Sequence, residues 1–110
     1  AAISDDRCYL FVAFCETQPI GILSAYRVPD LRAGGNLVYL YDIEVVKKYR
    51  NSGVGTGLIT ALISQCKADE VQLIWAGTDV DNMAARKTFE ATGGEVEGDS
   101  YVEYQWILKE

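Results

Sequence analysis

A short basic segment with two glycines, near the middle of the chain, has the residue types that bind a phosphate group. Arg50 stands three residues before Gly53, Gly55 follows, and an apolar helical pattern begins at once. Glycine lets the backbone approach a ligand closely, and the first turn of a helix presents unpaired N–H groups at the positive end of the helix dipole. Because these groups converge on one point, the segment is predicted to bind a diphosphate. The residues concerned are Arg50, Asn51, Ser52, Gly53, Val54, Gly55 and Thr56.

Two common nucleotide-binding motifs do not fit this segment. A Walker A loop would continue with Gly-Lys-Ser or Gly-Lys-Thr, which does not follow Gly55. In a Rossmann fingerprint the glycines follow the strand directly, whereas here the basic loop 47–52 intervenes. A glycine-rich turn can also do no more than end a loop, so the assignment needs support from a second motif.

Apolar runs and periodicities predict the elements that position this segment. Apolar runs bounded by turn residues indicate buried strands, and a turn at 16–19 joins the first two strands into a hairpin. Helical spacing of apolar residues after the third strand predicts an amphipathic helix with a buried face of Leu58, Ile59, Leu62, Ile63 and Cys66. The predicted strands are 8–15, 20–28, 37–46, 71–76 and 101–108, and the predicted helices are 53–67 and 82–92.

The order of these elements predicts the fold class. The third strand, first helix and fourth strand form a βαβ crossover, and the whole order ββ-βα-βα-β describes a single mixed α/β (α+β) domain over residues 1–110. Asp79 or Asp81 is predicted to cap the second helix, and Gly93 to end it in left-handed geometry. Both tryptophans are predicted to lie in the core.

The composition excludes several classes of function. The chain has 110 residues, no histidine and three cysteines, which excludes Ser-His and Cys-His nucleophile pairs and histidine-ligated metals. Because no C-x-x-C spacing occurs, reduced thiols of a cytoplasmic protein are favoured over a disulfide framework or a zinc site. A net charge of −6 argues against nucleic-acid binding and suits a cationic partner, although acidity can also serve solubility alone. No apolar run approaches the roughly 18 residues that span a membrane.

Two motifs in this order resemble those of the GNAT superfamily of N-acetyltransferases. Arg50-x-x-Gly53-x-Gly55, after the strand at 41–45, is similar to the acetyl-CoA signature of that superfamily. The stretch 82–93, Asn-x-x-Ala-Arg-x-x-Phe-Glu-x-x-Gly, is similar to its Asn-x-x-Ala-x-x-x-Tyr-Glu-x-x-Gly helix. Within the superfamily, residues 40–43 resemble most closely the Tyr-Asp-Leu pattern of aminoglycoside 3-N-acetyltransferases. The resemblance covers the chain from residue 8 on.

The resemblance implies how a CoA molecule would be held. Backbone N–H groups of about Asn51 to Thr56 would bind the pyrophosphate, with Arg50 as an added cation. The third strand would be splayed by a bulge, so that its exposed backbone at Ile43 and Val45 pairs with the pantetheine arm. The N–H of Val45 would polarise the thioester carbonyl as an oxyanion donor. The Asn82 side chain is similar to the family residue that bonds the pantetheine.

The resemblance also implies a role for the carboxylates on the third strand. An acceptor amine is protonated at neutral pH, so a carboxylate must bind it and help to remove a proton. Asp42 matches the carboxylate that faces the acceptor amine in the aminoglycoside enzymes. Glu44 lies two residues further on and shares a strand face with Asp42 unless the bulge separates them. Alternatively, both residues are polar only because they lie in solvent at the end of a strand.

The chain departs from the family pattern in two places. Phe89 occupies the helix position where the family usually has a tyrosine that protonates the departing thiolate, and phenylalanine has no proton to give. A thiol leaves as thiolate without much help, so we expect activity to survive, with Phe89 against the cofactor. Family members usually carry a strand and one or two helices before the first hairpin. We expect these to be missing here or supplied by a partner subunit.

Together these features predict an N-acetyltransferase that uses acetyl-CoA as co-substrate. The acceptor would be a small cationic amine, aminoglycoside-like or polyamine-like, which attacks the thioester directly in a ternary complex. Two alternatives stay open: a CoA-binding sensor or assembly module that has lost catalysis, and a protein or peptide N-acetyltransferase. The resemblance also implies homodimerisation as a common state, and no metal, nucleic acid or membrane is expected.

Overall fold

The computed structural model describes residues 7–98, 102 and 104–109 and contains a four-stranded sheet with two helices. Strands β1 to β3 form an antiparallel meander, and β4 pairs in parallel with β3 at the other edge. The four strands and two helices were predicted from the sequence to within two residues at each end, whereas the 3-10 turn lies in the predicted loop 47–52, and the mixed fold class is confirmed. The elements are β1 (Cys8–Cys15), β2 (Gln18–Pro29), β3 (Asn36–Val45), the 3-10 turn η1 (Lys47–Tyr49), α1 (Val54–Ala68), β4 (Leu73–Trp75) and α2 (Met83–Ala91).

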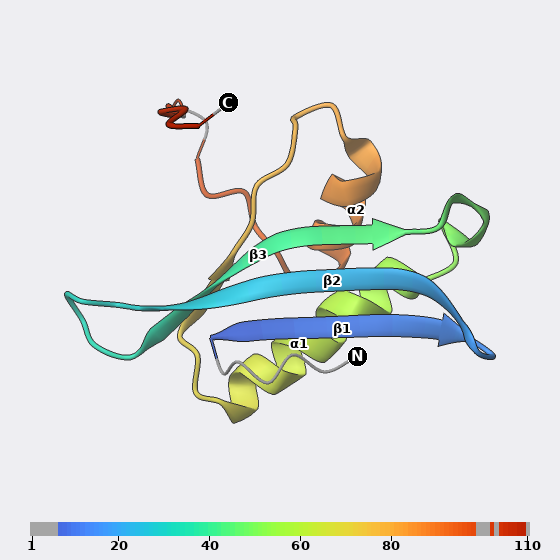
Figure 1. Cartoon of the computed structure of the whole chain (residues 1–110), viewed down its shortest axis with the longest axis horizontal. Helices are drawn as coiled ribbons and strands as arrows, with labels where there is room; N and C mark the ends of the chain where they lie inside the picture. Colours follow the sequence, from blue (N-terminus) through green and yellow to red (C-terminus); the bar gives the residue numbers. More distant parts are fainter. Residues whose placement is uncertain (1–6, 99–101, 103, 110) are drawn as a thin grey trace.

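Both helices lie on the same side of the sheet (Figure 1). Helix α1 packs across β1, β2 and β3, and α2 packs against α1. The opposite face of the sheet, which we call the open face, is covered by neither helix. The layering thus separates the side chains of each strand into a helix-covered set and an open set, because successive residues point to opposite faces.

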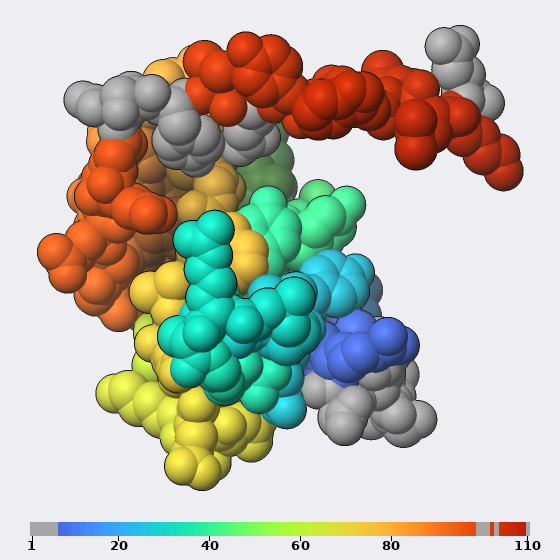
Figure 2. All heavy atoms as spheres, turned by 90° about the vertical axis from the view of Figure 1, so that its left-hand side faces the viewer, coloured from blue at the N-terminus to red at the C-terminus, as the bar shows by residue number. Residues whose placement is uncertain are grey.

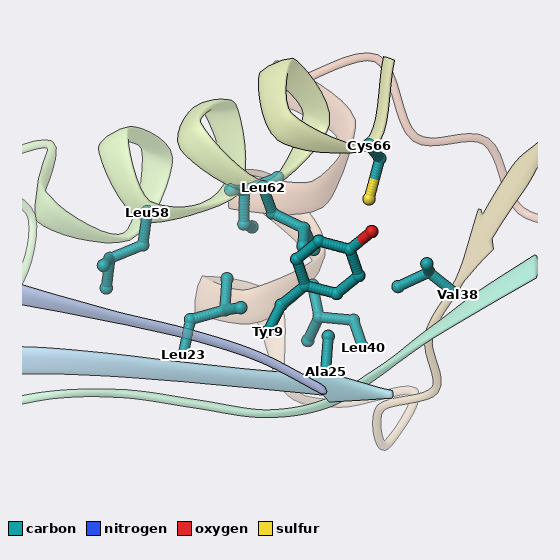
Figure 3. Close-up of a cluster of buried hydrophobic side chains, with 9 residues drawn as sticks. Tyr9, Leu23, Ala25, Val38, Leu40, Leu58, Leu62 and Cys66 are labelled. Atoms are coloured by element: carbon teal, nitrogen blue, oxygen red, sulfur yellow. The ribbon is translucent and has the colours of Figure 1, made fainter. Parts of the chain in front are cut away.

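The core lies between the sheet and α1 (Figure 3). The helical face predicted from the sequence is confirmed, with Ile63 packed at its margin. Leu23, Val38 and Leu62 are the largest of the core's fully buried side chains. The cluster consists of Tyr9, Leu23, Ala25, Val38, Leu40, Leu58, Ile59, Leu62 and Cys66.

A close approach between β2 and α1 fixes where the helix begins. A methyl group added at Gly21 would lie 2.9 Å from Val54 Cγ1 and 3.2 Å from Leu58 Cδ1, which is closer than such atoms pack. Because Gly21 has no side chain, the first turn of α1 can rest directly on the sheet. No local sequence pattern indicates this contact.

A polar cluster joins the other end of α1 to the first two strands. The Tyr9 hydroxyl donates to Asp69 Oδ2 over 2.8 Å, and Arg27 Nη2 donates to both the Tyr9 hydroxyl and Asp69 Oδ2 over 2.6 and 3.1 Å. The guanidinium also lies over the Tyr9 ring, 5.4 Å from its centre. Since Asp69 is the C-cap of α1, the cluster holds this end of the helix to β1 and β2.

Replacing Tyr9 with phenylalanine should lower the free energy of unfolding by about 1 kcal/mol at neutral pH, because Arg27 and Asp69 lose one hydrogen-bond partner. Burial, followed by the hydrogen bond to Asp69, raises the pKa of Tyr9 above its ordinary 10.0. As the pH rises, the Tyr9 hydroxyl therefore loses its proton in the unfolded chain before it does so in the folded protein. The stabilisation that this hydroxyl provides is present below about pH 10 and is lost at higher pH. Urea unfolding at about pH 7 and about pH 11 should show that the difference between the two proteins shrinks. A difference that stays constant would contradict this account.

The predicted last strand, 101–108, is not formed by the residues that the structure describes. Residues 102 and 104–109 belong to no strand, and positions 101 and 103 lie outside the described residues. In Figure 2 the residues 104–109, drawn in red, stand away from the strands. Alternating polarity produces a strand only where another strand edge is available for pairing. Trp106 is therefore 79% exposed, which corrects its predicted place in the core.

Two strands that were predicted to be buried are more exposed than expected. Both β1 and β4 are edge strands, so each has a neighbour on one side only among the described elements. In β4, Leu73 is 55% exposed and Trp75 is 37% exposed, although both had been predicted to be buried. In β1 the only fully buried residue is Tyr9. Apolar sequence alone indicates a strand but does not tell an edge from a centre.

Candidate functional site

The first turn of α1 is open to an anion. Gly53 is the N-cap and adopts a left-handed backbone with φ of 90°, and it has no side chain with which to cap the N–H groups that follow. The helix has no acidic residue in its first turn and is 15 residues long, so its positive end is not neutralised from within. Asn51 is also left-handed, with φ of 63°, which turns the loop toward the helix start.

The basic loop before α1 is tied to its own backbone. Arg50 Nε donates to the Val45 carbonyl over 3.0 Å, so the guanidinium lies where β3 ends. The Ser52 hydroxyl donates to the Tyr49 carbonyl and closes the turn. These contacts give the predicted loop residues a fixed shape while the side chain of Arg50 stays exposed.

Gly55, in the first turn of α1, faces the end of β3 and α2. A methyl group added there would lie 3.6 Å from Thr88 Cγ2 and 4.0 Å from both Ile43 Cδ1 and Val45 Cγ2. A side chain at this position would thus come into ordinary van der Waals contact with β3 and α2. Thr88 is a neighbour of Gly55 that sequence reasoning missed, because its position in the helix motif is a variable one.

Beyond residue 39, no strand in the described part of the chain pairs with the outer edge of β3, which we call the free edge. Strand β4 pairs with β3 only at 37–39 and ends at Trp75, opposite Tyr39. The Val46 N–H donates to the Ile20 carbonyl over 2.8 Å, and Val45 is opposite Gly21. In an antiparallel ladder this pattern points the N–H and C=O of Val45 away from β2, and those of Ile43 likewise. The backbone groups predicted to pair with a ligand therefore face the free edge, where the Val45 carbonyl already accepts from Arg50 Nε.

A β-bulge in β3 decides which side chains reach which face. Asp42 is paired with Ser24 and Leu40 with Ala25, so Tyr41 is an extra residue on β3. The bulge was predicted from the family resemblance. Without it, the alternation that buries Leu40 would also have turned Asp42 toward the core.

Beyond the bulge, the predicted catalytic carboxylates lie on the open face. Ile43 packs against the core cluster on the helix side, so Asp42 and Glu44, one residue to either side of it, point the other way. Both carboxylates are exposed. The basic loop and α1 thus lie on one side of the sheet at the free edge of β3, and the two carboxylates lie on the other side. The backbone of Ile43 and Val45 lies between them.

Two predicted cofactor residues lie on or just before α2. The Asn82 Oδ1 accepts from the Ala85 N–H over 3.1 Å, so Asn82 is the N-cap of α2. This corrects the prediction that Asp79 or Asp81 caps the helix; asparagine is an equally good cap and stands next to the first helical residue. Phe89 is half-buried and packs against the core cluster. The helix ends before Gly93, which has φ of 97°, as predicted.

The described residues contain no group of three or more histidine, cysteine, aspartate or glutamate side chains that could hold a metal ion. Their three cysteines are free, and burial, as the largest cause, raises the pKa of the Cys66 thiol. None of the described helices is both long and apolar enough to cross a membrane.

Comparison with known proteins places this arrangement in a family. The acetyltransferase (GNAT) family model matches residues 1–93. The chain therefore belongs to the GNAT family of acetyltransferases, and the resemblance seen in the two sequence motifs is confirmed. No curated protein matches the chain significantly.

Solved structures show the same fold at low sequence identity. The aminoglycoside acetyltransferase meta-AAC0020 from an uncultured soil metagenomic sample, in complex with trehalose, is 24% identical with a TM-score of 0.88, over 96% of this chain and 69% of its own. The aminoglycoside acetyltransferase AAC(6')-Iy, in complex with the bisubstrate analog CoA-S-monomethyl-acetylneamine, is 22% identical with a TM-score of 0.80, over 93% and 71%. The ribosomal-protein-alanine N-acetyltransferase of Brucella melitensis biovar Abortus 2308 is 19% identical with a TM-score of 0.76, over 93% and 74%. At these identities the likeness establishes the fold and not the acceptor.

Proposed function

We propose that the chain is an acetyl-CoA-dependent N-acetyltransferase that acts on a primary amine of a small cationic acceptor. The observation that carries the proposal is that the uncapped start of α1 lies beside the end of β3, where the N–H groups of Ile43 and Val45 point away from β2. A helix start of this kind can bind a diphosphate, and the outward-pointing backbone groups of a strand can pair with an extended amide-containing arm.

The residues present fit a CoA molecule. Backbone N–H groups from Asn51 to Thr56, with Arg50 beside them, would hold the pyrophosphate, and the Ile43 and Val45 backbone would pair with the pantetheine amides. Acetyl-CoA supplies an activated acyl thioester. AAC(6')-Iy, which shares the fold, has been crystallised with a CoA bisubstrate analog, and this supports the assignment.

Asp42 and Val45 would carry the chemistry. Asp42 would bind the ammonium group of the acceptor and accept a proton from it, directly or through water, so that the free amine can attack the acyl carbonyl. The Val45 N–H would stabilise the charge that develops on the carbonyl oxygen. A covalent enzyme intermediate is disfavoured, because the chain has no histidine to activate a cysteine. Phe89 cannot donate a proton, so the CoA thiolate would leave without a general acid at this position of α2.

The acceptor class rests on charge and on the structural neighbours. A net charge of −6 attracts polyamines and aminoglycosides, and Asp42 and Glu44 are both exposed on the open face. Several solved structures of this fold are aminoglycoside acetyltransferases, one of them in complex with sisomicin. Cytoplasmic location and homodimerisation stay predictions, the latter to be tested by sedimentation.

Calorimetric titration with acetyl-CoA, followed by an assay of thiol release with a panel of amines, tests the function. We expect one-to-one binding at micromolar concentration and release of free thiol that depends on a cationic amine. Binding without release above hydrolysis would favour the sensor or assembly module. Release with peptides but not with small amines would favour a protein N-acetyltransferase, and absence of binding would contradict the proposal.

Replacing Asn82 with aspartate separates its two roles. The aspartate oxygen can still cap α2, so the free energy of unfolding should be unchanged or slightly higher. The amide N–H donors are lost, so affinity for acetyl-CoA should fall roughly tenfold if they bond the pantetheine. Asn82→Ala, as control, should lose about 1 kcal/mol of stability together with affinity. Unchanged affinity in the aspartate variant would leave Asn82 with the capping role alone.

A further inference from the structure

Four aromatic side chains form a continuous row on the open face, next to the carboxylates. The ring of Tyr41 contacts those of Tyr26 and Tyr39 edge-on, with centroid distances of 5.5 and 6.3 Å. Tyr39 in turn contacts Trp75 of β4 at 5.2 Å. The row, which we call the aromatic row, thus crosses β2, β3 and β4 and consists of Tyr26, Tyr41, Tyr39 and Trp75.

The bulge in β3 explains why the aromatic row and the carboxylates share a face. Tyr39 points to the open face because Val38 and Leu40 point to the core. Tyr41 is the extra residue of the bulge, and its ring contacts place it on the same face as Tyr39. Asp42 follows at once and points the same way, so an aromatic ring and a carboxylate are adjacent on one surface.

Three members of the aromatic row are exposed, and Tyr39 is half-buried. Tyr41 is 63% exposed, Tyr26 43% and Trp75 37%. Aromatic rings of this kind attract cations through the negative charge of their faces, and a neighbouring carboxylate adds to that attraction. The surface therefore suits a molecule with more than one ammonium group, one at Asp42 and others over the rings.

We propose that the aromatic row is the specificity surface for the acceptor and selects polycationic amines over simple monoamines. This inference rests on the proposed function, because only an acetyltransferase has an acceptor. Binding of a polycation to the row can nevertheless be measured without turnover. A second copy of the chain is a less suitable occupant, because each copy carries a net charge of −6 and would bring Asp42 and Glu44 against like charges.

Binding of spermidine, neamine and butylamine to the full chain, by calorimetry without acetyl-CoA, tests the proposal. Spermidine or neamine should bind more tightly than butylamine, which has one ammonium group. Tyr41→Leu removes the ring and should weaken polycation binding about two- to fivefold, with a similar further loss in Tyr26→Leu/Tyr41→Leu. Tyr41→Phe keeps the ring and should bind like the parent. Phe14→Leu changes a side chain on β1 that is 57% exposed and should also bind like the parent.

The intrinsic fluorescence of Trp75 gives a second readout. The chain has two tryptophans, so Trp106→Phe leaves Trp75 as the only one. In that background spermidine should change the Trp75 emission, and Tyr41→Leu should shift the change to higher spermidine concentration.

The outcomes separate this inference from the proposed function. Polycation binding that depends on Tyr41, without thiol release, supports the specificity surface and contradicts catalysis. Thiol release whose KM ratio between spermidine and butylamine is unchanged in Tyr26→Leu/Tyr41→Leu supports catalysis and overturns the inference. Parent-like polycation binding in the leucine variants overturns it directly. A dimer that dissociates in Tyr41→Leu would also overturn it, because a second copy would then cover the row.

Discussion

Replacing Gly55 with aspartate should lower the affinity for acetyl-CoA by more than about 100-fold while the chain stays folded. The new carboxylate would stand in the first turn of α1, beside the N–H groups where a diphosphate is expected. Bringing like charges together in such a site costs several kcal/mol, and each 1.4 kcal/mol is about tenfold in affinity. Calorimetric titration of the variant with acetyl-CoA measures the loss.

Stability should move in the opposite direction from affinity. An acidic side chain in the first turn of a helix stabilises it by about 0.3–1 kcal/mol, and replacing a helical glycine adds to this. The methyl group of Gly55→Ala meets its neighbours at ordinary contact distances, so that variant should fold and bind more weakly than the parent but better than Gly55→Asp. Gly55→Asn, which has the volume without the charge, should lie between them. Parent-like affinity in a folded Gly55→Asp variant would remove the loop from the site.

The loop and its helix could be predicted from the sequence because their physics is local. Glycines at fixed spacing, a following apolar helical face and a preceding strand suffice to place unpaired N–H groups at one point. Helix α1 begins at Val54, one residue after its predicted start. The contact that positions this helix, between Gly21 and Val54, joins residues far apart in sequence and left no local pattern to read.

Which side chains share the open face could not be predicted, because that depends on where in β3 the inserted residue lies. Strict alternation along β3 would place Tyr39 and Tyr41 on one face and Asp42 on the other. The bulge at Tyr41 changes the alternation and brings all three to the open face. Sequence reasoning foresaw the bulge through the family resemblance but assigned the tyrosines no function, since aromatic residues in a strand are typical of packing.

Burial was the least predictable property. Trp75 and Trp106 have large apolar side chains of the kind that usually lie in a core. Trp75 nevertheless lies on an edge strand and Trp106 in a segment outside the sheet. Which strand becomes an edge depends on what pairs with it, and that information is not contained in the polarity of its residues.

Replacing Asp42 with asparagine should lower kcat/KM for the acceptor amine by about 10²- to 10⁴-fold, the usual worth of general acid–base catalysis. Asparagine keeps the size of the side chain but cannot accept a proton, so the protonated amine would remain unreactive. Affinity for acetyl-CoA should be unchanged, because Asp42 lies on the open face and the loop and α1 lie on the other side of the sheet. Thiol release with spermidine or neamine, together with acetyl-CoA calorimetry, measures both quantities.

Glu44→Gln is the matched comparison for this variant, since Glu44 shares the open face two residues further along β3. If Asp42 faces the amine, the aspartate variant should lose far more turnover than the glutamate variant. The reverse order would assign proton removal to Glu44. Glu97→Gln, an exposed substitution in the loop after α2, controls for the loss of one negative charge and should leave turnover unchanged. Turnover that survives in both Asp42→Asn and Glu44→Gln would mean that the open face does not present the acceptor to the thioester, and the acceptor site would then have to be sought on the helix side of the free edge of β3.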